Sequence, residues 1–531
     1  MRPDFEYGAR TNKEGAMTGT KGRLLVVATG GLILAAVLGH ATFGQSQEPR
    51  RGGTLKVGLE IEVSNLDPAT SAQGAAINMI QHVYNSLFRA DANLNPVPDL
   101  VERWEAPNET TYLFVVRRGV KFHNGREMTA DDVKYSFERM MDKKTGSPYA
   151  HFFDNVSKIE VPDKYTIRLS LKSPDASLLS NLTMPVTGIV PKEEVAKRGD
   201  LKTYMVGTGP FKFVSWVPNK ELVLARNPEY FEKNLPYLDE TRFVPITDET
   251  ARTAALRTGA VDFIDLAPAK DLPILKREAE IVITDGANVN YIAMPLNLKR
   301  KPFDNVKVRQ AIAYAINREA IVAAAFDGLA RPLYGGPLVP PYWAGAATRR
   351  YSYDVNMAKK LLAEAGYPNG VRSTLKIPAG YALYSNTAQA VQGELRRANI
   401  NLDIVAEEVG IWITNVWEKD LFDAYIIRFW GIDYIDPDGA VHRQFHSKGA
   451  FNKAGYSSAK VDELIERANR VSNREERRKL YDEIQTIVSE EAPYVFLVSA
   501  DRSEAHRSHV KGYVHLPNGS QYAFRQTWVS R

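Results

Sequence analysis

Residues 421–439 read LFDAYIIRFWGIDYIDPDG, and this stretch indicates both the fold and the place of a binding site. Its first part, residues 421–430, is rich in aliphatic and aromatic side chains and predicts a strand. Three acids and three aromatic rings then fall within residues 428–439. A solvated loop does not need the rings, and a buried core does not tolerate the acids. Because ligands bind beyond the carboxyl ends of strands in open α/β sheets, we predict a ligand site here.

Strands and helices alternate around this stretch. The pattern predicts, in order, a strand at 373–377, a helix at 385–398, a strand at 401–409, a short helix from Ile411, two long helices at 459–471 and 474–490, and a strand at 493–500. A succession of strand, helix and strand is typical of an open sheet with helices on its faces.

The first half of the chain has its own set of elements. Strands are predicted at 54–59, 111–117, 165–171, 211–216 and 221–225. Thr129 should cap a helix that ends at Met141, and Asp304 should cap a helix that stops at Gly328. With 531 residues and no internal repeat or low-complexity linker, the chain is expected to form two α/β lobes.

Composition excludes several classes of function. The chain has no cysteine, which rules out disulfides, thiolate zinc sites, thiol nucleophiles and a lipid anchor attached through a lipobox cysteine. The net charge of +5 is small, and the basic residues are spread among the acids, so no nucleic-acid partner is expected.

The N-terminus resembles an export signal. Basic residues at 21–23 precede an apolar run at 24–38, and small residues follow. The run is shorter than the roughly 20 residues of a spanning helix, although an uncleaved membrane anchor is the alternative. We therefore expect a signal peptide over residues 1–44 and a periplasmic mature protein.

The three acids of the opening stretch have different predicted roles. Asp436 precedes Pro437 and a predicted helix, so it should be an N-cap with proline at the first helical position. Asp438 should lie in the first helical turn, where the helix dipole favours an acid. Asp433 has no helix-capping role. It is either a ligand-binding acid or an ordinary one, namely a solvated turn acid or a partner of Arg428. Held among rings, its carboxylate would favour a ligand that brings an ammonium group.

An enzyme is not expected. The sequence has no G-x-S-x-G, H-E-x-x-H or phosphate-loop motif, and no cofactor is predicted. His442 and His446 have the i, i+4 spacing of metal ligands, but no third ligand is evident nearby, so no metal site is predicted.

Six longer sequence segments, taken together and in this order, resemble segments of one protein family. They are residues 65–91, 96–105, 111–140, 207–231, 248–265 and 303–321. The chain is similar to the extracytoplasmic solute-binding proteins of peptide and nickel ABC importers, the dipeptide/oligopeptide-binding class or solute-binding family 5.

This resemblance implies a bilobal periplasmic-binding-protein fold of the large, cluster C type, with two α/β lobes joined by hinge strands. Lobe I would comprise residues 45–289, lobe II residues 290–498, and residues 499–531 would complete lobe I. The lobes would close on a solute, and the protein would act as a monomer with permease subunits and their ATPases.

The resemblance also implies site residues. The family pattern W-x-x-D-x-x-[DE]-P falls on Trp430, Asp433 and Pro437, so Asp433 would receive a peptide's α-ammonium, with Trp430 and the adjacent Tyr434 as walls. By the same resemblance, residues Ser71, Ala72 and Gln73 would form the opposite lip. Apart from the resemblance, Trp412 is a candidate to line the cleft, with packing in the core as the alternative.

One departure bears on the ligand. Dipeptide binders carry an arginine after the LKIPAG segment, whereas residues 380–394 contain no arginine or lysine and present Tyr381 and Tyr384. Longer peptides or peptide-like, amine-bearing solutes are therefore expected. A nickel or other metal complex, a sugar or another cationic solute is the alternative.

Overall fold

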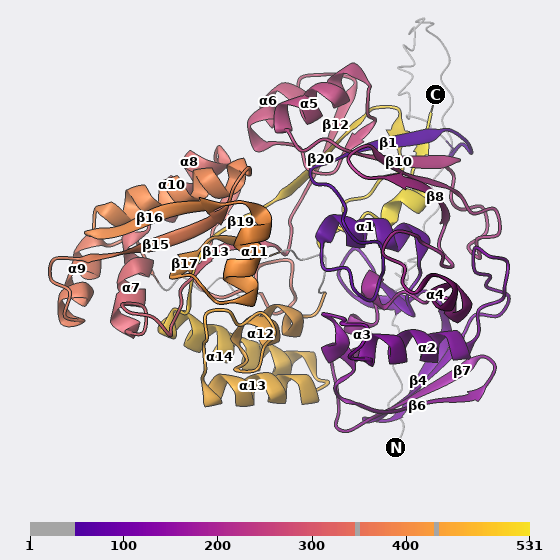
Figure 1. Ribbon diagram of the computed structural model, residues 1–531, viewed down its shortest axis with the longest axis horizontal. Helices are drawn as coiled ribbons and strands as arrows, with labels where there is room; N and C mark the ends of the chain where they lie inside the picture. The colour runs from indigo at the N-terminus through magenta and orange to yellow at the C-terminus, as the bar shows by residue number, and fades with distance from the viewer. Residues whose placement is uncertain (1–47, 346–350, 430–434, 531) are drawn as a thin grey trace, which may run out of the picture. The chain divides into compact units, whose positions relative to one another are not determined.

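A computed structural model describes residues 48–345, 351–429 and 435–530 (Figure 1). Residues Pro49–Arg531 form one compact unit, and the account below concerns that unit alone. The predicted signal peptide and the predicted site residues Trp430, Asp433 and Tyr434 lie outside the described residues. Among the helices that are described, none has both the length and the apolar character needed to cross a bilayer.

The largest sheet has seven strands and contains the first strand of the unit. In spatial order they are β12 (Ile281–Gly286), β20 (Arg502–Arg507), β11 (Phe263–Ile264), β1 (Thr54–Leu59), β10 (Glu240–Pro245), β9 (Glu221–Arg226) and β8 (Phe211–Val217). Strand β1 runs parallel to both β10 and β11, so these three strands end at the same edge of the sheet. Strand β20 comes from near the C-terminus and pairs with β11 and β12, which returns the chain to this sheet.

Residues 101–171 contain the strands of a four-stranded antiparallel sheet. Its order is β4 (Val101–Asn108), β5 (Thr111–Val116), β7 (Thr166–Leu171) and β6 (Val156–Asp163). Helix α2 (Ala130–Met141) contacts β6 and β7 and begins with the predicted cap, Thr129, which forms a capping box with Asp132. Its buried face includes Val133, Phe137 and Met140.

Shorter elements complete the first half. They are β2 (Phe88–Ala90), β3 (Pro96–Pro98), α1 (Gly74–Val83), α3 (Leu178–Asn181), α4 (Lys192–Arg198), α5 (Glu249–Thr258) and α6 (Leu272–Leu275). Near the C-terminus, β21 (Val510–Lys511) pairs with β22 (Trp528–Val529).

The second half contains the predicted alternation of strand and helix. Strand β15 (Val371–Pro378) is followed by α10 (Ala382–Arg396) and β16 (Ile400–Glu407), and β15 lies between β16 and β17 (Ala424–Tyr425) with all three parallel. A second sheet has the order β14 (Ala330–Pro332), β19 (Tyr494–Ala500), β13 (Tyr291–Pro295) and β18 (Ile427–Phe429).

The single strand predicted over residues 421–430 was wrong. The chain leaves the parallel sheet after Tyr425 and enters the other sheet at Ile427, where β18 pairs antiparallel with β13. Residues 424–426 are all fully buried. An uninterrupted buried run has no alternation of faces, so the sequence does not reveal where one strand ends and the next begins.

The helix predicted from Asp304 to Gly328 is two helices. Helix α7 (Val306–Ala315) is capped by Asn305, whose side chain accepts a hydrogen bond from the Lys307 amide at 2.9 Å. Helix α8 (Arg318–Phe326) is capped by Asn317. Asparagine side chains bind nearby backbone amides and so favour helix starts over helix interiors, which explains the break.

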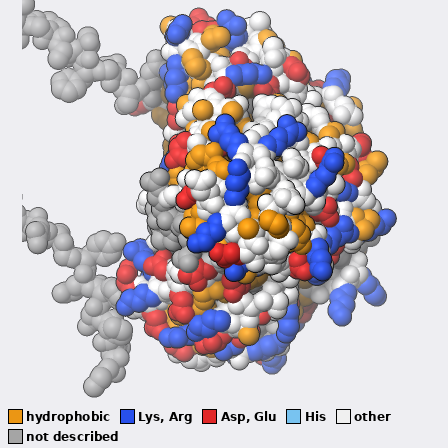
Figure 2. Space-filling model, turned by 90° about the vertical axis from the view of Figure 1, so that its left-hand side faces the viewer, with side chains coloured by type: hydrophobic (Ala, Val, Ile, Leu, Met, Phe, Trp, Pro, Cys, Tyr) orange, Lys and Arg blue, Asp and Glu red, His pale blue; other side chains and the backbone are white. Residues whose placement is uncertain are grey.

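The second half contains five further helices among the described residues. They are α9 (Val355–Glu364), α11 (Val409–Ile413), α12 (Pro437–Phe445), α13 (Ala459–Arg470) and α14 (Arg474–Glu491). Several of them pack on one another, as α13 does on α12 and α14. The two long helices predicted from the sequence are therefore confirmed. On the face shown in Figure 2, lysine, arginine and acidic side chains are interspersed with apolar ones. The predicted monomeric state stays a prediction.

Asp436 fixes the start of α12 through a buried ion pair. As predicted, its side chain caps the helix, accepting a hydrogen bond from the Asp438 amide at 3.0 Å. Arg477 of α14 donates two further hydrogen bonds to the same carboxylate, at 2.7 and 3.0 Å, and both side chains are almost completely buried. This pair holds the chain in place immediately after residues 430–434.

Replacing Arg477 with methionine should destabilise the fold strongly. Removing one partner of a buried pair leaves the other charge without compensation, which costs about 3–5 kcal/mol. We expect urea unfolding followed by circular dichroism to show a loss of that size in the free energy of unfolding. Lys479→Met, at an exposed position of the same helix, should change it by less than about 0.5 kcal/mol. Equal effects of the two substitutions would contradict the structural role of the pair.

Candidate functional site

Residues that flank the segment 430–434 in the sequence line two cavities. Arg428, two residues before this segment, lines a cavity with Tyr381, Tyr384 and Trp412, which we call the aromatic cavity. Ile435, the residue directly after the segment, lines a small pocket with Arg89 and others. Described residues just before and just after the predicted site segment therefore line cavities.

The aromatic cavity is built at the carboxyl ends of parallel strands from both halves of the chain. Glu60 and Ile61 directly follow β1, Thr247 follows β10 and Leu266 follows β11. From the other half, residues 378–384 follow or end β15 and Val409 follows β16. The cavity has a volume of about 410 Å³, within the usual range for small-ligand sites.

Three aromatic rings line this cavity beside several aliphatic side chains. The rings of Tyr381 and Tyr384 meet edge to face with centroids 6.0 Å apart. Trp412 is buried and packs against Trp417 and Tyr425, and its indole Nε1 has no hydrogen-bond partner among the described residues. Burial raises the pKa of Tyr384 to about 12, so its hydroxyl stays protonated at neutral pH. Two predicted site residues, Tyr381 and Trp412, thus lie in one cavity.

Charged side chains of both signs line the same cavity. Arg252 is buried and donates hydrogen bonds to the carbonyls of Ile246 at 2.8 Å and Leu266 at 3.3 Å. Lys270 forms an ion pair with Glu249 at 3.0 Å. Burial lowers the pKa of the Arg428 guanidinium, while the negative charge of Glu60 raises it. Rings together with fixed charges allow binding of a solute that is both apolar and charged.

A second cavity of about 440 Å³ adjoins the first. The residues that line both are Glu249, Arg252, Leu266, Lys270, Ala382, Leu383 and Arg428. The second cavity continues to residues 500–503, where the chain passes from β19 to β20. A solute longer than the aromatic cavity would have space to extend in this direction.

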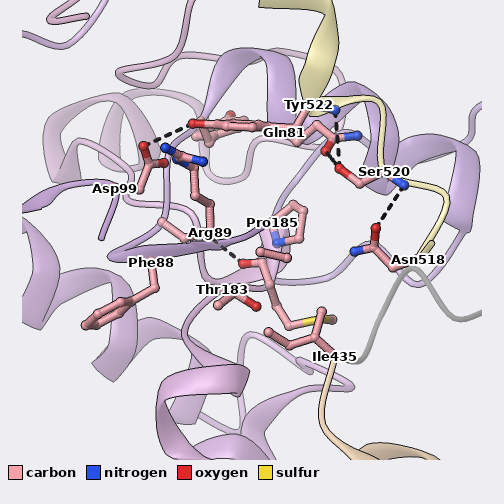
Figure 3. Close-up of a pocket in the computed structure, with 14 residues that line it drawn as sticks. Gln81, Phe88, Arg89, Asp99, Thr183, Pro185, Ile435, Asn518, Ser520 and Tyr522 are labelled. Atoms are coloured by element: carbon pink, nitrogen blue, oxygen red, sulfur yellow. Dashed lines mark hydrogen bonds between the residues drawn. The ribbon is translucent and has the colours of Figure 1, made fainter. Parts of the chain in front are cut away.

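The small pocket beside Ile435 has a volume of about 30 Å³ and a polar wall (Figure 3). Asp99 is buried there and accepts hydrogen bonds from Asn85 at 2.9 Å and from the Tyr522 hydroxyl at 3.0 Å. Burial raises the pKa of this carboxyl group, against the opposing effects of those hydrogen bonds and of the nearby arginines, including Arg89. A space of this size holds a water molecule or the end of a larger ligand.

Residues Ser71, Ala72 and Gln73 precede α1 and are not among the described residues that line the aromatic cavity. The Gln73 side chain accepts a hydrogen bond from the Ser64 amide at 3.1 Å and donates one to the Glu62 carbonyl at 2.7 Å. Gln73 thereby fixes the loop after β1. Contact of these three residues with a ligand stays a prediction.

The two histidines of α12 stack on one another, with ring centroids 4.6 Å apart. Burial lowers the pKa of both His442 and His446, which favours the neutral rings. Across the described ranges, no three His, Cys, Asp or Glu side chains are grouped so that they could hold a metal ion.

The sequence interpretation missed Glu60, Arg252 and Lys270. The rule that ligands bind beyond strand ends was applied to residues 421–430, yet it applies equally to β1, and would have indicated Glu60. Arg252 and Lys270 carry no such local signal, because their place in the cavity depends on the packing of α5 and the following loop.

Similarity to known proteins identifies the family of this chain. Residues 95–452 match the family model described as "Bacterial extracellular solute-binding proteins, family 5 Middle". The chain belongs to this family. The glutathione-binding protein GsiB of Salmonella choleraesuis (strain SC-B67) is 30% identical over 467 residues, which cover 86% of this chain and 90% of GsiB.

Two solved structures have the same fold. The binding protein AgaA of A. tumefaciens R10, in complex with agropinic acid, has a TM-score of 0.83 and 29% identity, covering 90% of this chain and 99% of AgaA. The ABC transporter-associated periplasmic binding protein DppA of Helicobacter pylori, in complex with the peptide STSA, has a TM-score of 0.83 and 29% identity, covering 91% and 99%.

The predicted family and fold class are confirmed by these matches. Proteins of this family are the substrate-binding components of ABC importers, and the relatives named here bind solutes. They act outside the cytoplasm, as the family's description states.

Asp438 gives the fold a measurable pH dependence. Burial and the neighbouring charge of Asp436 raise its pKa to about 7, although it lies in the first turn of α12, where the helix dipole favours the anion. An acid whose folded pKa is raised stabilises the fold below its unfolded pKa, near 4, and this contribution is lost as the pH rises to about 7.

Asp438→Asn should therefore gain stability relative to the wild type as the pH rises. Between pH 4 and pH 8 we expect the difference in free energy of unfolding to shift by about 2–3 kcal/mol in favour of the variant. Urea unfolding at a series of pH values measures this difference. Glu463→Gln, exposed on α13, should show a shift below about 0.5 kcal/mol. A flat difference for Asp438→Asn would disprove the raised pKa.

Proposed function

We propose that this protein captures peptides or peptide-like, amine-bearing solutes outside the cytoplasm and delivers them, chemically unchanged, to the permease and ATPases of an ABC importer. The observation that carries the proposal is the aromatic cavity at the carboxyl ends of two sets of parallel strands. Its rings and fixed charges suit a solute with apolar and charged groups. Relatives that bind glutathione and the peptide STSA give independent support.

Capture would follow from closure of two lobes over the solute. The proposed lobe I comprises residues 45–289 and 499–531, and lobe II comprises residues 290–498. Strand β20, near the C-terminus, lies in the sheet of β1, while β13 and β19 pair in the second sheet, which is consistent with this division. A solute would favour the closed state only through contacts that it gains there.

Asp433 is proposed to receive the ammonium group of the solute, with Trp430 and Tyr434 beside it. This role rests on the sequence pattern, since all three residues lie outside the described ranges. The positions of Arg428 and Ile435 support it, because each lines a cavity next to this segment.

Native mass spectrometry of the purified protein would test the proposed class of solute. We expect an adduct whose mass matches a short peptide or an amine-bearing solute, and the same compound added back should raise the melting temperature. A retained nickel complex or sugar would overturn the proposal in favour of the alternative solutes.

Asp433→Asn should abolish binding of solutes with a free amine. A buried charge pair that loses one partner costs about 3–5 kcal/mol, or at least 100-fold in affinity. Isothermal titration calorimetry with free and N-acetylated forms of one peptide measures this. The wild type should prefer the free amine, and the variant should lose that preference while its melting temperature stays close to that of the wild type. Equal binding of both forms by the wild type would contradict the ammonium role.

A further inference from the structure

We propose that Glu60 receives a second positive charge of the solute, on a basic side chain that enters the aromatic cavity, so that the protein selects basic peptides or similarly dicationic solutes. This inference rests on the proposed function and adds a specificity-determining residue to the same site. Most of the charged side chains that line the cavity already have partners within the protein.

The cationic side chains on the cavity wall are held by other groups. Arg252 is occupied by backbone carbonyls, and Lys270 pairs with Glu249 at 3.0 Å. Arg428 of β18 lines the cavity although it is almost completely buried, and the charge of Glu60 opposes the effect of burial on the pKa of its guanidinium. A solute therefore meets few cations that can turn toward it.

The acidic side chains that line the cavity differ in whether they have a partner within the protein. Asp248 caps α5 by accepting a hydrogen bond from the Ala251 amide at 2.7 Å, and Glu249 is neutralised by Lys270. The carboxylate of Glu60 has no hydrogen bond and no ion pair with any described residue. The buried guanidinium groups of Arg428 and Arg502 are close enough for the charge of Glu60 to raise their pKa values, but neither makes a direct contact with it. Among the described acids that line the cavity, Glu60 is thus the one whose carboxylate has no direct partner.

The backbone holds Glu60 in position at the end of β1. Its amide donates a hydrogen bond to Oδ1 of the buried Asp265 at 3.2 Å, so the residue does not depend on its own side chain for placement. Its negative charge raises the pKa of Tyr381, Tyr384 and Arg428, which puts the carboxylate near the two tyrosine rings. Carboxylate and rings thus face one space.

Rings around a carboxylate suit a cation with a long side chain. Aromatic faces attract ammonium and guanidinium groups, and the flat guanidinium also stacks on rings. The carboxylate adds charge-assisted hydrogen bonds, which are stronger than neutral ones. A neutral side chain of the same length would keep the ring contacts but leave the charge of Glu60 without a partner.

Glu62 provides a matched control two residues further on. Its carboxylate accepts hydrogen bonds from the Asn219 amide at 3.0 Å and from the Trp216 indole at 3.4 Å, so it is already used within the protein. It is absent from the described lining of the aromatic cavity.

The experiment compares the wild type, Glu60→Gln and Glu62→Gln by isothermal titration calorimetry. The probes are tripeptides with a free amine, with lysine or norleucine, and arginine or citrulline, placed at each position in turn. We expect the wild type to prefer the charged member of a pair by about 10- to 100-fold at one position. Glu60→Gln should reduce that ratio to less than about 3-fold while keeping its affinity for the neutral peptide, and Glu62→Gln should retain the ratio.

The outcomes separate this inference from the proposed function. Wild-type binding of charged and neutral members with equal affinity overturns the role of Glu60 and leaves peptide capture intact. A preference that survives in Glu60→Gln also overturns it. Failure of the wild type to bind any peptide overturns the proposed function itself. Should Glu60→Gln fold poorly, Glu60→Asp, which retains the charge, should keep the preference for the basic peptide.

Discussion

Parallel strand pairing is the constraint on which the rest of the site depends. Because β1 runs parallel to β10 and β11, the residues after these strands gather at one edge, and the same holds for β15 and β16. Backbone hydrogen bonds therefore fix where Glu60, Thr247 and the Tyr381 segment lie before any side chain contributes. The side chains at these positions are free to vary with the solute, since the sheets are held by other residues. This arrangement explains how related chains can share a fold and bind different solutes.

The fold could be predicted where the sequence contains local signals. Capping residues and periodic apolar faces identified α2, α13 and α14, and the alternation around β15 and β16 identified an open parallel sheet. The errors have physical causes. The run at residues 424–426 is buried throughout and carries no period, so the passage between two sheets could not be seen. The break at Asn317 was missed because an asparagine in a helical pattern can either cap or simply be tolerated.

The site could be predicted only in part. Tyr381 was singled out because it stands where dipeptide binders of the family carry an arginine, and Trp412 as an aromatic residue that could line the cleft or pack in the core. Both line the aromatic cavity, and their contact with a solute stays a prediction. Glu60 was missed because a single acid after a strand resembles any surface acid. Its significance depends on which of its neighbours already have partners. That information exists only in three dimensions, in the hydrogen bonds of Arg252 and the ion pair of Lys270.

Which charged side chains already have an ion-pair partner also determines which of them can select among solutes. An ion pair such as that between Asp436 and Arg477 is formed during folding, so a solute gains nothing from it and it serves only to hold the chain after residues 430–434. A carboxylate such as that of Glu60, which has no hydrogen bond or ion pair with a described residue, would gain a direct partner only when a solute supplies a positive charge. Closure of the proposed lobes on such a solute would be favoured, and closure on a neutral one would be opposed by desolvation of that carboxylate. In this protein, selection among solutes and the conformational response to them would therefore have the same electrostatic origin.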